Sequence, residues 1–387
     1  MRATVLLLCA VLAAALAVGA WALFLREDEG HGLRIGVLED VVKLPDPQLA
    51  DERVALVSQA GFNALNVTTL WAPGQRTPVP GELALLSNVA KAAEDRRIRL
   101  LVTVYAARPR DAPTDDARRG EYAAFMAALA RGLPTVRDFA IWNEPNLNGF
   151  WLHQFDESGA DIAASNYAAL LAVTYDALKE VSPRIRVYGG NLSPRGFDDA
   201  DSTRPTHSPT TFIRDMGRAY RDSARTEPIM DIFALHPYQQ RSSIQPSTEH
   251  TGTSLGIGDY DKLVDLLGEA FDGTAQPGSK LPIAYTEFGV QSEIPEAAQG
   301  PYTNLQSPIG RDAVPEQTQA QYYRQALELA ACQETVVAVY IFHLIDEADL
   351  NRWQSGPYYA DLKPKSSFDE IRKAALEARN GKLTDCS

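Results

Sequence analysis

Two glutamates occupy equivalent positions at the ends of apolar runs in the sequence. Glu144 follows the run 136–142, and Glu287 lies near the end of the run 281–289. Both runs predict strands that are buried on both faces, as in a parallel sheet, and Pro145 ends the first of them. A single glutamate there is more often a capping or salt-bridging group. Two carboxylates at one site supply what hydrolysis of a glycosidic bond needs, because one protonates the leaving oxygen and the other attacks or activates water.

The residues around the two glutamates resemble two motifs of one enzyme clan. Residues 142–146 (WNEPN) resemble the acid/base motif of clan A of the retaining glycoside hydrolases, most like families 39 and 5, which include β-xylosidases and cellulases. Residues 286–289 (TEFG) resemble the nucleophile motif of the same clan. The resemblance implies that Glu144 is the general acid/base, that Glu287 is the nucleophile, and that Asn143 binds the 2-hydroxyl group of the substrate.

The same resemblance implies roles for residues at the end of the sixth predicted strand. Tyr238 is expected to form a hydrogen bond with Glu287 that holds this carboxylate ionised, and His236 is expected to line the sugar site. Flat aromatic side chains stack on the apolar faces of sugar rings. We therefore expect Trp71, at the end of the second strand, and Trp353, after the eighth, to contact the sugar.

The sequence departs from the clan in two places. Many members carry a tryptophan at the end of the eighth strand, where this chain has Phe342 and His343. Either His343 or Phe342 lines the sugar site, or Trp353 reaches it from the following loop. The second strand also lacks an arginine that many members have. These two departures leave the inner sugar subsite, and with it the identity of the sugar, open. For Trp151, sugar contact and loop packing fit the sequence equally well.

Short apolar runs alternate with amphipathic runs along the rest of the chain. The predicted strands are 34–39, 62–71, 98–105, 136–143, 185–190, 230–238, 283–288 and 336–345. The predicted helices are 47–60, 82–96, 115–131, 162–181, 209–223, 260–270, 316–334 and 367–378. Eight strand–helix pairs in strict alternation predict an α/β fold with a single (β/α)8 TIM barrel. The two glutamates then end strands four and seven, which face each other across the barrel mouth.

The N-terminus predicts a segment outside the barrel. Residues 3–25 carry no charge and lie between Arg2 and the acidic residues 27–29. Such a run fits a membrane anchor, although small residues at its end also fit a cleaved signal peptide. We therefore expect an anchor or signal in 1–30, the glycoside hydrolase domain in 31–380, and a tail in 381–387. The catalytic domain is expected to be extracellular or at the cell surface, with membrane contact through the N-terminal segment only.

Charge and cysteine content narrow the classes of partner. The formal net charge of −13 disfavours nucleic acid and anionic membrane surfaces as partners. Export permits a disulfide between Cys332 and Cys386, and the alternative is a buried free Cys332 with a loose tail. No metal-binding or nucleotide-binding motif occurs in the sequence, so we expect no cofactor. The sequence does not indicate an oligomeric state.

Together these patterns predict an exported retaining β-glycosidase that hydrolyses O-glycosidic bonds of a polysaccharide or oligosaccharide through a covalent glycosyl-enzyme. Two alternatives stay open. One is an inverting or transglycosylating barrel that uses the same carboxylates. The other is a catalytically weak barrel that binds polysaccharide in cell-envelope or exopolysaccharide assembly. Long polar loops at 191–207, 239–258 and 290–315 fit either a groove for endo action or a pocket for exo action.

Overall fold

The computed structural model describes residues 33–306, 312–383 and 386 of the 387-residue chain. The predicted membrane or signal segment lies outside these residues. Within the described ranges, no helix has both the length and the apolar character needed to cross a membrane.

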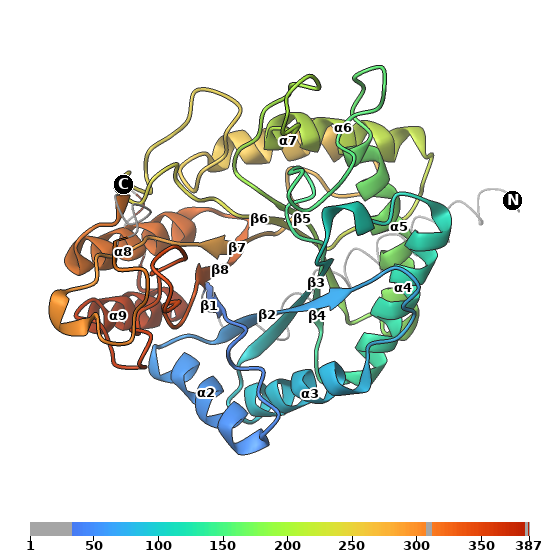
Figure 1. The fold of residues 1–387 in the computed structure, drawn as a ribbon. Helices are drawn as coiled ribbons and strands as arrows, with labels where there is room; N and C mark the ends of the chain where they lie inside the picture. Colours follow the sequence, from blue (N-terminus) through green and yellow to red (C-terminus); the bar gives the residue numbers. More distant parts are fainter. Residues whose placement is uncertain (1–32, 307–311, 384–385, 387) are drawn as a thin grey trace, which may run out of the picture.

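Eight parallel strands close into a barrel in the order of the sequence, and helices surround them (Figure 1). The strands are β1 (Arg34–Leu38), β2 (Ala64–Trp71), β3 (Arg99–Ala106), β4 (Asp138–Ile141), β5 (Arg186–Leu192), β6 (Ile232–Leu235), β7 (Ile283–Phe288) and β8 (Val336–Phe342). The helices are α2 (Pro47–Gln59), α3 (Pro80–Asp95), α4 (Asp116–Gly132), α5 (Ala163–Val181), α6 (Pro209–Asp222), α7 (Tyr260–Phe271), α8 (Glu316–Cys332) and α9 (Phe368–Arg379), with short 3-10 helices η1 (Pro109–Asp111) and η2 (Glu296–Ala298). The predicted TIM barrel is confirmed.

Helix starts follow from local chemistry. The side chain of Asp46 accepts hydrogen bonds from the backbone of Gln48 and Leu49 at the start of α2, where Pro47 occupies the first turn. Ser208 caps α6 in the same way, again before a proline. These caps satisfy backbone donors that have no partner within the helix, and proline is suited to the first turn.

The barrel interior is lined by small side chains with a few large ones. The buried cluster inside the strands consists of Ala64, Leu101, Ala140, Tyr188, Ile232, Ala234, Ala284, Ala338 and Tyr340. Gly36 on β1 fits this arrangement, because a Cβ atom there would lie 2.7 Å from the Tyr340 ring and 2.8 Å from the Cβ of Ala64. The interior is therefore a packed core rather than a channel, as is usual for this fold.

An ionic cluster occupies the N-terminal end of the barrel. The buried carboxylate of Asp138, the first residue of β4, accepts two hydrogen bonds from the Arg99 guanidinium, at 2.7 and 3.2 Å. It accepts two more from Arg186, at 2.7 and 2.8 Å. These residues begin three adjacent strands, so the cluster fixes that end of the sheet with a paired charge.

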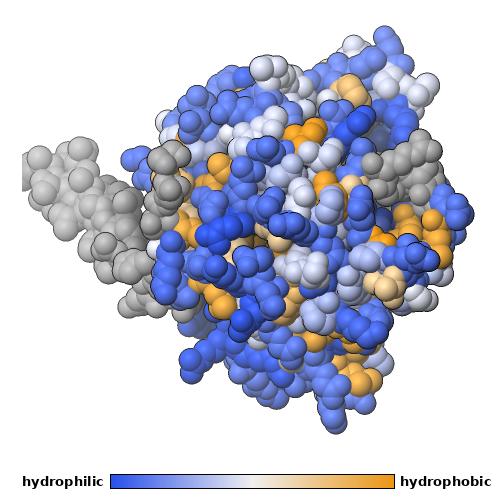
Figure 2. All heavy atoms as spheres, turned by 90° about the vertical axis from the view of Figure 1, so that its left-hand side faces the viewer, coloured by the Kyte–Doolittle hydropathy of each residue, from blue (hydrophilic) through white to orange (hydrophobic). Residues whose placement is uncertain are grey.

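The C-terminal part of the chain is tied to α8. Cys386 forms a disulfide with Cys332, the last residue of α8, across a sequence separation of 54 residues. Figure 2 shows the side of the molecule that carries α8 and α9, where hydrophobic groups are scattered among hydrophilic ones.

Candidate active site

Glu144 lies just beyond the C-terminal end of β4, in a backbone segment with unusual conformation. Trp142 has φ 69° and Glu144 has φ 41°, which are left-handed values that cost energy for residues other than glycine. The backbone N–H of Glu144 donates to the carbonyl of Asn191 on β5 at 2.9 Å. The Glu144 side chain is 15% exposed, so it is largely buried but still in contact with solvent.

Glu287 lies near the end of β7, at an irregularity in the pairing with β8. Tyr285 pairs with Val339 and Phe288 pairs with Ile341, so the register shifts around the glutamate. The phenol of Tyr238 donates a hydrogen bond to Oε2 of Glu287 at 3.0 Å. This hydrogen bond is the one that the resemblance implied.

His236 brings the two glutamates together. Its Nδ1 atom lies 3.1 Å from Oε1 of Glu144 and 3.6 Å from Oε2 of Glu287. Oε1 of Glu144 and Oε2 of Glu287 are therefore less than about 7 Å apart, a limit that includes the roughly 5–5.5 Å of retaining glycosidases. Glu144 after β4 and Glu287 on β7 therefore lie at one site, as the sequence predicts.

Burial and nearby charges shift the pKa values of Glu287 and His236. Burial raises the pKa of Glu287 and the nearby charge of Glu144 raises it further, while His236, the Tyr238 hydroxyl and His343 act in the opposite direction. Burial alone would lower the pKa of His236, but the carboxylates of Glu287 and Glu144 outweigh burial and raise this pKa. The charge state of Glu287 therefore depends on the charges of its neighbours Glu144 and His236.

Tyr238 fixes the role of one oxygen of Glu287. Burial, followed by the charges of Glu287 and Glu144, raises the pKa of Tyr238 well above its ordinary value. The phenol therefore keeps its proton and acts as a donor, and Oε2 of Glu287 acts as the acceptor. A hydrogen bond of this kind favours the ionised carboxylate.

Asn143 lies between the two residues with left-handed backbone and is 9% exposed. Within the described part of the chain, its side-chain amide makes no hydrogen bond. The amide thus has donors and an acceptor that a ligand can use, next to Glu144 in sequence.

An aromatic cluster flanks the Glu287 side of the site. The half-buried ring of Trp353 lies 5.2 Å from the Tyr238 ring and 5.4 Å from the Phe342 ring, measured between ring centroids. His343 follows Phe342, is partly exposed, and places Nε2 3.8 Å from a carboxylate oxygen of Glu347. Trp353 and His343 therefore both lie near the predicted sugar position.

The prediction of a sugar contact is wrong for Trp71. Its side chain is 1% exposed, packs edge-on against Tyr122 at 5.5 Å, and donates its indole N–H to the carbonyl of Gln75 at 2.8 Å. The ring lies in the layer between sheet and helices and has no free face. Trp151 is also fully buried, against Trp142 and Tyr167, so loop packing accounts for it.

Two residues of the site were not anticipated from the sequence. Glu39, just after β1, is 2% exposed and accepts hydrogen bonds from the backbone of Leu344 and Ile345 after β8. The sequence offered a clue to Glu39, because this glutamate also follows an apolar run, as Glu144 does. Asn191 at the end of β5 is 1% exposed and contacts both glutamate-bearing segments, and no catalytic motif in the sequence marked it.

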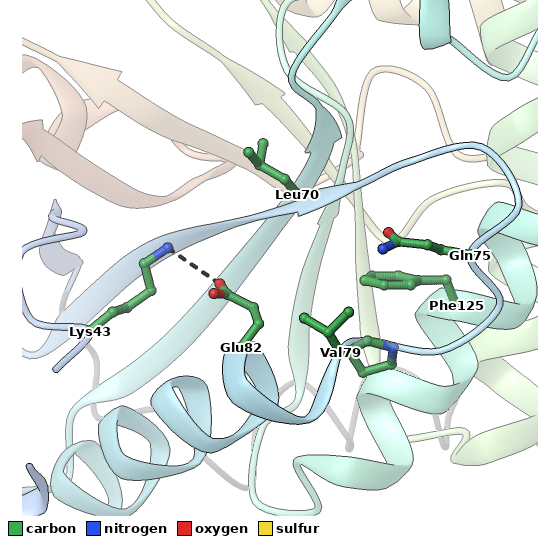
Figure 3. Close-up of a pocket in the computed structure, with 7 residues that line it drawn as sticks. Lys43, Leu70, Gln75, Val79, Glu82 and Phe125 are labelled. Atoms are coloured by element: carbon green, nitrogen blue, oxygen red, sulfur yellow. Dashed lines mark ion pairs between the residues drawn. The ribbon is translucent and has the colours of Figure 1, made fainter. Parts of the chain in front are cut away.

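A separate pocket lies outside the glutamate pair, between β2 and α3 (Figure 3). Its volume is about 260 Å³, and its lining includes Leu70, Phe125 and the pair Lys43–Glu82, whose charged atoms are 3.5 Å apart. Lys43 also donates to the carbonyl of Thr68 at 2.6 Å. Its cation is therefore already satisfied, and the pocket has no carboxylate pair of the kind that Glu144 and Glu287 form.

The sequence matches no protein-family model and no curated protein. The structure is similar to a GH39 enzyme from Xanthomonas axonopodis pv. citri, with a TM-score of 0.56 and 16% identity over 88% of this chain and 65% of that one. The chain has the barrel fold of glycoside hydrolases. A GH39 β-xylosidase from Caulobacter crescentus gives a TM-score of 0.52 at 17% identity, covering 89% of this chain and 72% of that one.

A smaller neighbour matches over its whole length. A triple mutant of an endo-β-1,4-glucanase from Xanthomonas axonopodis pv. citri gives a TM-score of 0.56 at 14% identity, covering 89% of this chain and 100% of that one. At such identities the similarity establishes the fold. The chain spans 65% of the length of the first GH39 enzyme, so the two are not matched end to end.

Proposed function

We propose that this protein is a retaining β-glycosidase that cleaves O-glycosidic bonds of an oligosaccharide or polysaccharide. The observation that carries the proposal is the arrangement of Glu144 and Glu287 around one nitrogen of His236, at 3.1 and 3.6 Å. Two carboxylates at one site suit attack on the sugar by one and proton donation by the other, and the two oxygens are close enough for the roughly 5–5.5 Å separation of retaining enzymes.

In this proposal Glu287 is the nucleophile. The Tyr238 hydrogen bond and the neighbouring His236 stabilise its ionised form against the effect of burial. Its carboxylate attacks the anomeric carbon, the glycosidic C–O bond breaks, and a covalent glycosyl-enzyme forms.

Glu144 serves both halves of the reaction. It donates a proton to the departing oxygen in the first step, and in the second step its carboxylate takes a proton from the water that releases the sugar. Asn143 binds the 2-hydroxyl group in this proposal, and the absence of a hydrogen bond to its side-chain amide within the described residues supports that role. Trp353 and His343 line the sugar position on the side of β8.

Azide rescue tests the two roles separately. On an aryl β-glycoside that the wild type cleaves, Glu287→Ala with azide is expected to yield the α-glycosyl azide, because the anion attacks from the vacated nucleophile side. Glu144→Ala with azide is expected to yield the β-glycosyl azide, because the glycosyl-enzyme still forms on a substrate with a good leaving group. Swapped products would reverse the roles, and a chain that binds oligosaccharides without cleaving any would be a polysaccharide-binding barrel instead.

We also propose that the protein is exported and tethered by residues 3–25. The uncharged run between Arg2 and an acidic flank supports a membrane segment with the barrel outside. The Cys332–Cys386 disulfide fits an oxidising compartment. Cell fractionation and sequencing of the mature N-terminus test this, since a soluble product starting near Trp21 would indicate a cleaved signal.

A further inference from the structure

The end of β5 contains one residue more than the strand beside it. Gly190 pairs with Ala234 and Leu192 pairs with Leu235, so Asn191 is the extra residue of a β-bulge. Asn191 has φ 51° and is 1% exposed. Bulges re-aim side chains and occur often beside active sites, and this one directs the Asn191 amide into the space between other strands.

Asn191 forms hydrogen bonds with the residue before Asn143 and with the residue after it, on the segment that follows β4. Its backbone carbonyl accepts the N–H of Glu144 at 2.9 Å. Its Nδ2 atom donates to the carbonyl of Trp142 at 2.9 Å. These two hydrogen bonds hold the residues before and after Asn143, which are the two with left-handed backbone conformations.

The other end of the same amide is bonded to β7. The hydroxyl of Thr286 donates to Oδ1 of Asn191 at 2.7 Å, and the next residue in the chain is Glu287. The orientation of the amide is chemically determined, because the Trp142 carbonyl can only accept a hydrogen bond. One buried side chain thus links the segment carrying Glu144 to the strand carrying Glu287, without passing through β6.

We infer that Asn191 is a positioning residue that fixes the distance between Glu144 and Glu287. The inference rests on the proposed glycosidase function. The Asn191 side chain forms no hydrogen bond with either carboxylate. It acts through Thr286, which directly precedes Glu287, and through Trp142, which lies two positions before Glu144. A displacement of about 1 Å at reacting groups can lower a rate by about a hundredfold, so the link matters for turnover more than for ground-state binding.

The barrel contains a matched pair that serves as a control. Thr103 on β3 donates its hydroxyl to Oδ1 of Asn66 on β2 at 2.8 Å, and both residues are buried. The two pairs have the same chemistry and burial. Thr103 pairs with Ala140 on β4, but among the described residues neither the Thr103 hydroxyl nor the Asn66 amide forms a hydrogen bond with residues 142–146 or with β7. Loss of either hydroxyl should lower the melting temperature by a similar amount.

The test compares Thr286→Val with Thr103→Val on an aryl glycoside cleaved by the wild type. We expect Thr286→Val to lower kcat about 10- to 100-fold with KM changed less than about 3-fold, and Thr103→Val to leave kcat within about 3-fold. Thr286→Ser, which keeps the hydroxyl, should recover most of the loss. The double variant Thr286→Val/Asn191→Ala should be no slower than Asn191→Ala alone, because each substitution removes the same hydrogen bond between Thr286 and Asn191.

The pH dependence of kcat/KM shows whether Thr286 and Asn191 position the glutamates or only stabilise the fold. If the carboxylates move apart in Thr286→Val, Glu144 raises the pKa of Glu287 less, and the acid limb of kcat/KM moves to lower pH. Equal effects of Thr286→Val and Thr103→Val on kcat, with an unmoved acid limb, would overturn the inference while leaving the glycosidase function intact. A wild type that cleaves no glycoside would overturn both. If Thr286→Val does not fold, Asn191→Asp against Asn66→Asp makes the same comparison.

Discussion

The two ends of the barrel use buried carboxylates in opposite ways. At the N-terminal end, Asp138 is held by Arg99 and Arg186, and although burial opposes ionisation, the two guanidinium groups bring its pKa far below the ordinary range. At the C-terminal end, Glu287 and Glu144 both lie near Nδ1 of His236. Burial raises the pKa of Glu287 above its ordinary value. The first arrangement places one carboxylate between two cations, and the second places two carboxylates around one histidine.

The difference separates groups that stabilise the fold from groups that are available for chemistry. Four hydrogen bonds from Arg99 and Arg186 leave Asp138 little capacity to bind anything else. Glu287 has one hydrogen bond from Tyr238 and keeps 13% of its side chain exposed. Perturbed carboxyl groups with few fixed partners are typical of functional sites.

The largest expected effect comes from removing the nucleophile. Glu287→Ala should lower kcat by about 10⁴-fold or more, because no carboxylate is left to form the glycosyl-enzyme. Its melting temperature should stay equal to or above that of the wild type, since the variant loses a buried carboxyl group whose charge is unfavourable there. Steady-state kinetics and thermal unfolding on the same preparation check both, and a stable, fully active variant would contradict the comparison.

The opposite end should show the reverse pattern. Asp138→Asn should cost about 3–5 kcal/mol of unfolding free energy, because two partly buried guanidinium groups lose their counter-charge, while kcat of the folded protein stays within about 3-fold. Because the pKa of Asp138 is depressed in the folded state, its contribution is present above about pH 4 and declines as the pH falls below that value.

Denaturant unfolding at several pH values measures this contribution. The gap in stability between wild type and Asp138→Asn should narrow as the pH falls below about 4. A gap that widens in acid would mean that the charge of Asp138 is not what holds this end of the barrel.

A smaller effect is expected from Tyr238→Phe. The variant loses the hydrogen bond that lowers the pKa of Glu287, so this pKa should rise. Since the nucleophile must be ionised, the acid limb of the kcat/KM profile should move to higher pH, with a loss of about 10- to 100-fold at low pH. An acid limb at the wild-type position would show that Tyr238 does not control the ionisation of Glu287.

The sequence predicted the features that are encoded in short stretches of neighbouring residues. Eight alternating runs predicted the barrel, and two short motifs placed Glu144 and Glu287 at facing strand ends, where the structure brings them to His236. Asn191 was missed because its direction depends on the register between β5 and β6, which is a tertiary property. Trp71 was misassigned because a strand-end position does not reveal whether a side chain faces the mouth or the helices.

The central claim is that Glu287 attacks the sugar and forms a covalent intermediate. A 2-deoxy-2-fluoro glycoside with a good leaving group slows release of the sugar, and it should be built on the sugar of the best aryl substrate. After incubation with the wild type and proteolysis, mass spectrometry should find one equivalent of fluorosugar on the peptide containing Glu287, and none in Glu287→Ala. Label on the peptide of Glu144, or steady turnover of natural substrate with no labelled peptide, would contradict the account.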